Sequence, residues 1–450
     1  MKSPSGAKMG FVLSLVVLSV LYGTAVGRWQ WFPYSVLEQA VETAKTVAKP
    51  LDPLLQTRDY DRSGVRAARP EQMQPGLTLL SSSWEGPGGL ETELRLMDQA
   101  GDVVHKWRVN REAVFEGGGW RKDPTQTGVH GSELLPNGDA LVNVEYVGLA
   151  RLNSCGEVQW TLREGNHHAV SPAGDGTFWT PAVSRERRTG SERHPDGFPG
   201  IDKPVWLDRI LHVSGEGEIL QDINVLDVLY ANGLDRYLHK ATWGGKSPPN
   251  GVPEDVTHIN DVEPLLPSMA DEYPRFEAGD LVISVRRFHL VFVFDPESLD
   301  VKWHASDPFI AQHDPDFIGD GWIGVFDNNT DGTGRGMQLG GTRIVALQPH
   351  TDSMEVRFPT PHSEPFYTAG LGKWHLLENG NMLLAETESG RVVEVDSTGR
   401  TVWEWIHPPY DEPRVPEIRQ AVRHDLLLKD VAVWPCTSVD TSQGTSVHGD

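Results

Sequence analysis

The stretch AQHDPDFIGDGW, residues 311–322, decides the fold because its pattern returns along the chain. Its histidine, His313, stands seven positions before the turn Asp320-Gly321 (320 − 313 = 7). Two other segments, which start at His130 and His168, repeat this distance. A third, which starts at Gly372, has the same distance but glycine in place of histidine. A fourth begins the same way at His258 but has a Pro-rich insertion before its turn. A pattern that returns about every 40 to 90 residues, as this one does between His130, His168, His258 and His313, is typical of repeat architectures.

Short apolar runs follow each of these turns. The first run after the turn is DALVNV, TFWTPA, DLVISV, WIGVFD or NMLLAE, and an alternating run comes next, as in GLARLNS or RVVEVDS. A further run often carries tryptophan, as in VQWTLR and VWEWIH. Four short strands per repeat, with turn residues between them, predict a β-propeller.

The repeat predicts an all-β, six-bladed β-propeller. Five complete units begin near residues 127, 166, 256, 311 and 370, and a sixth at 76–109 has no first strand of its own. The C-terminal segment 418–428, IRQAVRHDLLL, can supply that strand and close the ring. Closure of this kind removes exposed sheet edges.

The rest of the chain divides around this propeller. We expect a signal peptide or membrane anchor at residues 1–27, a linker with a helix in SVLEQAVETAKTVAK at 28–70, the propeller at 71–436 and a disordered tail at 437–450. Lys2 and Lys8 flank an apolar run at 9–26 that resembles an export signal and also approaches the length of a membrane span. Both alternatives place the propeller outside the cytoplasm, in the periplasm, secreted, or attached to the membrane through residues 9–26.

Net charge and cysteine content limit the classes of ligand that the chain can bind. Acidic residues outnumber basic ones 63 to 40, which gives a net charge of −23 and argues against a nucleic acid ligand. The two cysteines, Cys155 and Cys436, have no metal-binding spacing, and an exported protein allows either a disulfide or two free thiols.

The repeated histidines would line the central channel, because the innermost strand of each blade faces it. His130, His168, His258 and His313 then approach one axis from four blades, where they could act on a ligand or hydrogen-bond neighbouring blades. Seven positions after the turn glycine the same register finds three more polar residues, namely Glu145 (138 + 7), Arg286 (279 + 7) and Asn328 (321 + 7). A guanidinium beside channel histidines suits a tetrahedral oxyanion.

Several of these motifs resemble the arylsulfate sulfotransferase family. They are HH, DVTHINDVEP, VISVRRF with VFVFDP, QHDPDF with VFDN, and GRVVEVDSTGRTVWEW, and the resemblance spans about 76–435. It implies a six-bladed propeller that transfers a sulfuryl group from an aryl sulfate to a phenol through a sulfated histidine, without a nucleotide sulfate donor, metal or other cofactor.

The resemblance also assigns roles. His313 of QHD matches the family nucleophile, and His258, Arg286 and His168 match the groups that assist it. The family motif HHD corresponds to His167-His168, but Ala169 replaces its aspartate here. We further expect substrate contacts from four residues of the same register or motif: His167, His130, Asn328 and Glu145.

Two other function classes remain open at this point. Channel histidines can hold zinc in a propeller lyase, although a cationic Arg286 beside a metal would be unfavourable. Two long insertions, residues 184–204 and 223–256, and the alanine at position 169 also suit a propeller that binds a ligand without catalysis. Metal analysis separates the first alternative, and turnover of an aryl sulfate separates the second.

Overall fold

A computed structural model describes residues 6–29, 52, 54–86, 89–115, 128–240, 254–333 and 335–436. The chain forms two compact units, residues 1–53 and 54–450. In the first, α1 (Gly6–Trp29) contains a stretch, Lys8–Val26, that is long and apolar enough to cross a membrane. This helix is compatible with a signal peptide or an anchor. The helix expected in the linker at 35–49 and the tail at 437–450 lie outside the described residues.

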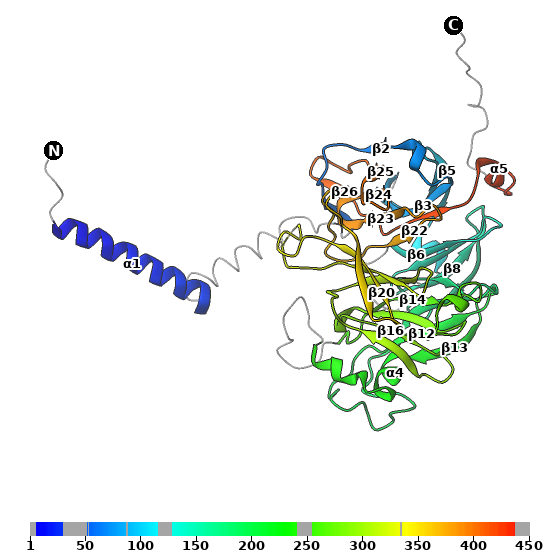
Figure 1. Ribbon diagram of the computed structural model, residues 1–450, viewed down its shortest axis with the longest axis horizontal. Coiled ribbons are helices and arrows are strands. Elements are labelled where there is room, and N and C mark those ends of the chain that lie inside the picture. The colour runs from blue at the N-terminus through cyan, green and yellow to red at the C-terminus, as the bar shows by residue number, and fades with distance from the viewer. Residues whose placement is uncertain are drawn as a thin grey trace, which may run out of the picture. The chain divides into compact units, whose positions relative to one another are not determined.

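The second unit is the predicted six-bladed β-propeller (Figure 1). Each blade is an antiparallel sheet whose first-named strand is innermost. Blade 1 contains β27 (Gln420–His424), β3 (Leu77–Gly86), β4 (Gly89–Met97) and β5 (Val103–Arg108); blade 2 contains β6 (Val129–Leu134), β7 (Ala140–Val144), β8 (Gly148–Leu152) and β9 (Val158–Leu162). Blade 3 contains β10 (Ser171–Pro172), β11 (Phe178–Val183), β12 (Asp208–Val213) and β13 (Ile219–Asn224); blade 4 contains β14 (Ile259–Pro264), β15 (Leu281–Val285), β16 (Leu290–Phe294) and β17 (Val301–Ala305). Blade 5 contains β18 (His313–Phe317), β19 (Ile323–Asp327), β20 (Arg343–Gln348) and β21 (Ser353–Phe358); blade 6 contains β22 (Trp374–Leu376), β23 (Met382–Glu386), β24 (Arg391–Val395) and β25 (Thr401–Ile406).

The ring closes as the sequence predicted. Strand β27 pairs with β3 from Gln420 opposite Ser81 to His424 opposite Leu77. In Figure 1 the red C-terminal segment therefore runs beside the blue start of the propeller. The closing strand comes from within 418–428, so the last and first parts of the chain share blade 1.

Two strands lie where the sequence predicted only a linker. Strand β2 (Gly64–Ala67) pairs with β25 and gives blade 6 a fifth strand, and β1 (Leu55–Thr57) pairs with β26 (Arg414–Pro416). Both are short and lack the apolar alternation of the blades, and β2 is at least partly exposed along its length. A pattern search does not detect such edge strands, which are held by pairing rather than by burial.

The core consists of separate apolar clusters between neighbouring blades. One joins blades 3 and 4 through residues such as Ile210 and Phe292, and another joins blades 4 and 5 through Val291 and Val325. Further clusters join blades 1 and 2, 1 and 6, 5 and 6, and 2 and 3. Each blade therefore buries both of its faces against its neighbours, which fixes the inner strands around the channel.

The remaining connections add short helices. They are η1 (Pro70–Gln72), α3 (Arg111–Val114), α4 (Val225–Ala231), η2 (Leu234–Lys240), η3 (Ala270–Glu272), η4 (Arg286–Phe288), η5 (Thr387–Ser389) and α5 (Leu428–Val431). The segment INVLDVLYANGLDRYLHK, residues 223–240, contains α4 and η2. Neighbouring strands in a blade run in opposite directions. The inner strand therefore begins at the same end of the propeller at which the second strand connects to the third and at which one blade connects to the next. The insertions 184–207, 225–258 and 328–342 are all such links, so their described residues lie at the end of the propeller where the inner strands begin.

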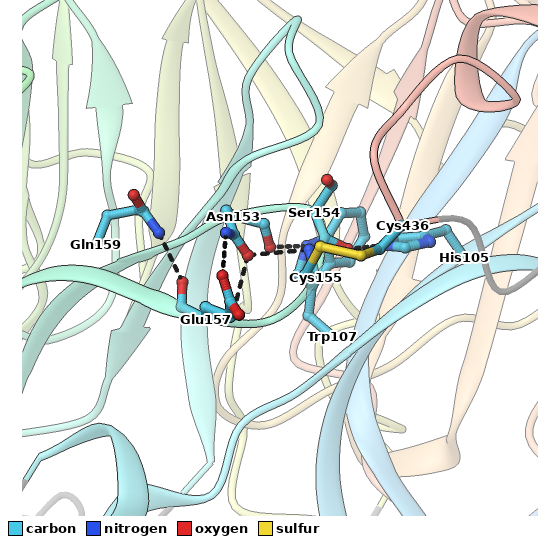
Figure 2. Close-up of a disulfide and its surroundings, with 8 residues drawn as sticks. All are labelled: His105, Trp107, Asn153, Ser154, Cys155, Glu157, Gln159 and Cys436. Carbon is cyan, nitrogen blue, oxygen red and sulfur yellow. Dashed lines mark hydrogen bonds between the residues drawn. A yellow bond between two sulfur atoms is a disulfide. The ribbon is translucent and has the colours of Figure 1, made fainter.

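A disulfide between Cys155 and Cys436 fastens the C-terminal segment to blade 2 (Figure 2). Cys155 lies in the turn between β8 and β9, where the Asn153 side chain accepts hydrogen bonds from the backbone N–H of Cys155 and of Glu157, both at 2.9 Å. Trp434 packs near Trp107, with ring centroids 6.0 Å apart. A Cβ at Gly138 would lie 2.6 Å from the Trp434 ring, and its φ of 84° also favours glycine there. Residues 425–436, which follow β27, are thus held both by a covalent bond and by packing.

Candidate active site

The channel histidines lie at the end where the inner strands begin. Counted back four residues from the last residue of the inner strand, His130, His168 and His313 occupy equivalent positions in blades 2, 3 and 5 (134 − 4, 172 − 4, 317 − 4). In blade 4 that position belongs to Asn260 (264 − 4), and His258 lies two residues earlier, just before β14. The shared register inferred from sequence therefore does not extend to His258.

The structure nevertheless brings the four rings together. The ring centroid of His168 lies 4.1 Å from that of His130, 5.2 Å from that of His258 and 6.4 Å from that of His313. His130, His168 and His313 are almost inaccessible to solvent. His168 and His258 have left-handed backbones, with φ of 59° and 49°. Residues other than glycine adopt this conformation rarely and at a cost, which is a common feature of functional sites.

His313 is held in one orientation through its Nδ1 atom. Nδ1 lies 2.6 Å from Oδ1 of Asn328 and 3.1 Å from the carbonyl oxygen of Ala311. The Asn328 amide nitrogen donates to the carbonyls of Thr368 at 3.0 Å and Leu371 at 2.7 Å, which fixes the amide so that Oδ1 faces the ring. Since both groups near Nδ1 are acceptors, Nδ1 carries the proton and Nε2 carries the lone pair.

The electrostatic environment keeps His313 neutral. Burial lowers the pKa of His313 well below its usual value, and the positive charge of Arg286 lowers it further. Arg286 begins η4, directly after β15, and its backbone N–H donates to the carbonyl of His258 at 3.2 Å. Burial and the charge of Arg287 lower the pKa of Arg286 itself. Among the described residues the Arg286 guanidinium forms no salt bridge, so it is available to an anion.

His168 is held by a second histidine instead of an aspartate. Its Nδ1 lies 2.7 Å from Nδ1 of His167, and Nε2 of His167 lies 3.7 Å from Asp208. Asp208 is fixed by hydrogen bonds from the Thr257 hydroxyl at 2.6 Å and from a backbone N–H at 2.9 Å. The aspartate that the family has at position 169 is alanine here, and His167 occupies the place of a polar partner for His168.

His258 is held by a carboxylate. Its Nδ1 lies 2.6 Å from Asp255, which also accepts a hydrogen bond from Arg287 at 3.0 Å. Although burial raises the pKa of Asp255, His258 and Arg287 lower it overall, so Asp255 is ionised. With Nδ1 engaged, Nε2 of His258 is the nitrogen that can exchange a proton with a substrate.

The expected substrate contacts at Glu145 and His130 are part of an internal network. Glu145 accepts a hydrogen bond from Arg419 at 2.7 Å and lies 3.7 Å from Nδ1 of His130. Arg419 also donates to Glu417 at 2.6 Å. Burial raises the pKa of Glu145, but Arg419 and His130 lower it overall. The network connects the closing segment near β27 to the histidine cluster.

Sequence reasoning did not find several residues of the site. Tyr146 lies with its ring 4.9 Å from that of His167 and has a left-handed backbone with φ of 54°. Asp208, Asp255 and Arg419 come from loops or strand ends outside the repeated register. Only Asp255 had a local signal, since it stands three residues before His258.

The arrangement of the site residues bears on the zinc alternative. Among the residues that the structure describes, no group of three or more His, Cys, Asp or Glu side chains is arranged to hold a metal ion. Nδ1 of His313, His168 and His258 is in each case taken by a neighbouring side chain. These contacts leave the Nε2 atoms of the three rings directed toward the shared space, where the positive charge of Arg286, which acts on His313, is unfavourable for a metal ion.

A sequence model described as arylsulfotransferase (ASST) matches residues 129–407, which is more than half of the chain. The chain belongs to the arylsulfotransferase family. The matched region contains His130, His168, His258, Arg286 and His313. No curated protein matches the chain.

Solved structures similar to this chain are distant in sequence. One is a protein of unknown function from Bacteroides caccae, with 12% identity, a TM-score of 0.45, and coverage of 74% of this chain and 94% of that chain. Another is a streptogramin B lyase, with 10% identity, a TM-score of 0.38, and coverage of 79% and 87% respectively. The WD40 propeller domain of Doa1 has 10% identity, a TM-score of 0.39, and coverage of 79% of this chain and 86% of that chain.

Proposed function

We propose that this protein moves a sulfuryl group from an aryl sulfate to a phenol through a sulfated His313, without a nucleotide sulfate donor. The observation that carries the proposal is the orientation of His313. Asn328 fixes the proton on Nδ1, so a neutral ring presents the Nε2 lone pair. The charge of Arg286, whose guanidinium forms no salt bridge with the described residues, acts on the same ring. A neutral imidazole in this form is a competent nucleophile.

In the first half-reaction Nε2 of His313 attacks the sulfur of the donor. The new N–S bond forms as the bond from sulfur to the aryl oxygen breaks, and its electron pair leaves on the phenolate. Arg286 stabilises the charge on the sulfuryl oxygens, in the way that oxyanion donors stabilise phosphoryl transfer. The phenolate takes a proton from Nε2 of a doubly protonated His258, whose Nδ1 proton stays with Asp255.

In the second half-reaction the acceptor phenol attacks the sulfur. Nε2 of His258 accepts the phenol proton, the N–S bond breaks, and its electron pair returns to His313. Donor phenol leaves before acceptor phenol binds, so the kinetics are ping-pong. His168 adjoins both rings and is oriented by His167, and we assign it to the sulfuryl oxygens.

The four expected substrate contacts receive more specific roles in this proposal. Asn328 orients His313, and His167 orients His168. His130 and Glu145 support the face of His168 and connect it to Arg419. These residues act through their neighbours rather than through the substrate.

The proposed location is outside the cytosol. The apolar helix α1 is compatible with export or anchoring, and a disulfide is typical of oxidising compartments. Small aryl sulfates and phenols are the substrate class that the family suggests.

Incubation of the purified protein with 4-nitrophenyl sulfate, with and without phenol, tests the proposal. We expect nitrophenol release that rises when phenol is added, and one sulfuryl group on the peptide that contains His313 when phenol is absent. His313→Ala should abolish both, whereas His350→Ala, which changes an exposed histidine on the β20–β21 turn, should leave both unchanged. Activity that survives in His313→Ala would assign the nucleophile elsewhere. A protein that cleaves no aryl sulfate would favour a binding propeller.

A further inference from the structure

Lys373 connects the strands that carry two of the site histidines. It lies just before β22 of blade 6, and its Nζ donates to Asp261 of β14 at 2.7 Å and also to Asp314 of β18. Asp314 directly follows His313, and Asp261 is three residues after His258. One ammonium group therefore ties the inner strands of blades 4 and 5 to blade 6.

Asp314 has no part in orienting the His313 ring directly, but it fixes the backbone beside it. Its carboxylate accepts a hydrogen bond from the backbone N–H of Trp374 at 2.7 Å, and its carbonyl accepts one from the Trp374 indole at 3.0 Å. Its φ is 50°, and the β18–β19 register shifts between His313 and Pro315. A bulge of this kind redirects the neighbouring side chain, and a left-handed aspartate needs surrounding contacts to persist.

The channel beyond Lys373 is strongly acidic. A cavity of about 580 Å³ is lined by Asp261 and Asp314 and by three further carboxylates, those of Glu133, Glu263 and Asp316. In the described part of the chain these three form no salt bridge. Lys373 is the cation between this cavity and the histidine cluster, and its side chain is only 14% exposed. Without it, Asp261 and Asp314 would repel each other and the strands of His258 and His313 would lose their common partner.

We propose that Lys373 is a positioning residue that holds His313 and His258 at their working separation. The proposal rests on the proposed function, because it gives that separation a catalytic purpose. The nucleophile and the proton-exchanging group sit on different blades, and the Lys373 ion pairs provide a polar link between those blades at the level of the site. A displacement of about 1 Å in such a constellation can cost up to about 10²-fold in rate.

Kinetic comparison of Lys373→Met with Lys373→Arg tests this role. We expect Lys373→Met to lower kcat for 4-nitrophenyl sulfate about 10- to 100-fold with less than about a threefold change in KM, and Lys373→Arg to recover most of the loss. The matched control is Lys302→Met, which removes a lysine paired with buried Asp280 at 2.8 Å on an outer strand. It should keep the kcat of the unchanged protein.

A measurement that needs no turnover separates this proposal from the proposed function. The Nδ1–H proton of His313, which is hydrogen-bonded to Asn328, should give a low-field NMR signal that moves or is lost in Lys373→Met and is retained in Lys302→Met. If the unchanged protein cleaves no aryl sulfate, the proposed function fails while this signal still decides whether Lys373 positions His313. If Lys373→Met does not fold, Asp261→Asn replaces it, since that change cuts the link to β14 alone. An unchanged kcat together with an unchanged signal would overturn the proposal.

Discussion

At the scale of single residues, the site depends on which nitrogen of each histidine is engaged. Asn328, His167 and Asp255 each contact the Nδ1 atom of a different ring, so all three Nε2 atoms remain for chemistry. An interaction that fixes the tautomer and direction of a ring typically changes activity by 10- to 100-fold when it is removed. Asn328 is the most direct test, because its own amide is held by two carbonyls.

Asn328→Ala should therefore lower kcat for 4-nitrophenyl sulfate about 10- to 100-fold and leave KM nearly unchanged, because Nδ1 of His313 loses its acceptor. Asn329→Ala is the matched control. Asn329 is equally buried, but its amide binds the carbonyls of Leu339 and Gly341 in the adjoining loop and does not contact His313. Steady-state kinetics of both variants give the comparison, and equal losses would indicate that the loop, not the His313 contact, matters.

At the scale of elements, the closing strand is the part of the fold that most depends on distant contacts. Strand β27 pairs with β3, and the segment after it is held by the Cys155–Cys436 disulfide (Figure 2). This bond spans 281 residues. A cross-link over so long a separation restricts the unfolded chain strongly, and loss of a native disulfide often costs 2–5 kcal/mol.

Cys436→Ser and Cys155→Ser should each lower the free energy of unfolding by about 2–5 kcal/mol, and the double variant should match either single one. Denaturant unfolding under non-reducing conditions measures this, and a reducing agent should bring the unchanged protein to the level of the variants. A larger loss in one single variant than in the double would show that a leftover thiol, not the missing bond, causes the effect.

The sequence predicted the blades well because their signal is local. The histidine-to-turn spacing marks the inner strands of blades 2, 3 and 5, Gly372 keeps the same spacing in blade 6, and the apolar runs that follow the turns mark the other strands. The segment 418–428 could be assigned because blade 1 was visibly incomplete. By contrast, β1 and β2 leave no periodic pattern, and the pairing of the two cysteines depends on a fold that brings residues 155 and 436 together.

The site was less accessible to sequence reasoning, since its contacts join residues that are far apart in the chain. Register found His130, His168 and His313, whereas His258 lies two residues from the equivalent position. Register also selected Asn328, but its partner His313 could be identified only when β18 and β19 were seen paired.

At the scale of the whole molecule, the acidic channel makes stability depend on pH. Burial raises the pKa of Glu133 to about 8 and that of Glu263 to about 8, against an ordinary value of 4.5. Between those values the folded protein binds more protons than the unfolded chain. The contribution of each group is therefore fully present below about pH 4.5 and is lost as the pH rises through about 8.

Glu133→Gln should accordingly raise Tm relative to the unchanged protein at pH 9 and have little effect at pH 4.5. At pH 9 the free energy of unfolding should rise by about 1–3 kcal/mol, since solvent in the cavity reduces the cost of burying the ionised Glu133 carboxylate. Glu297→Gln, at an exposed turn, is the control and should give the same small difference at both pH values. Thermal unfolding from pH 4.5 to 9 measures the effect, and a parallel pair of curves for Glu133→Gln and the unchanged protein would contradict it.

The position of the disulfide also determines how the protein responds to a protease. Arg187 is exposed in the insertion 184–207, so trypsin can cut the chain there into residues 1–187 and 188–450. Cys155 lies in the first fragment and Cys436 in the second, and the two fragments also share the sheet of blade 1. A nicked molecule should therefore migrate as one species on a denaturing gel without reductant, as two with it, and as an intact propeller in native size-exclusion chromatography. The two fragments of a cut chain would therefore remain one covalently linked molecule that keeps the propeller fold.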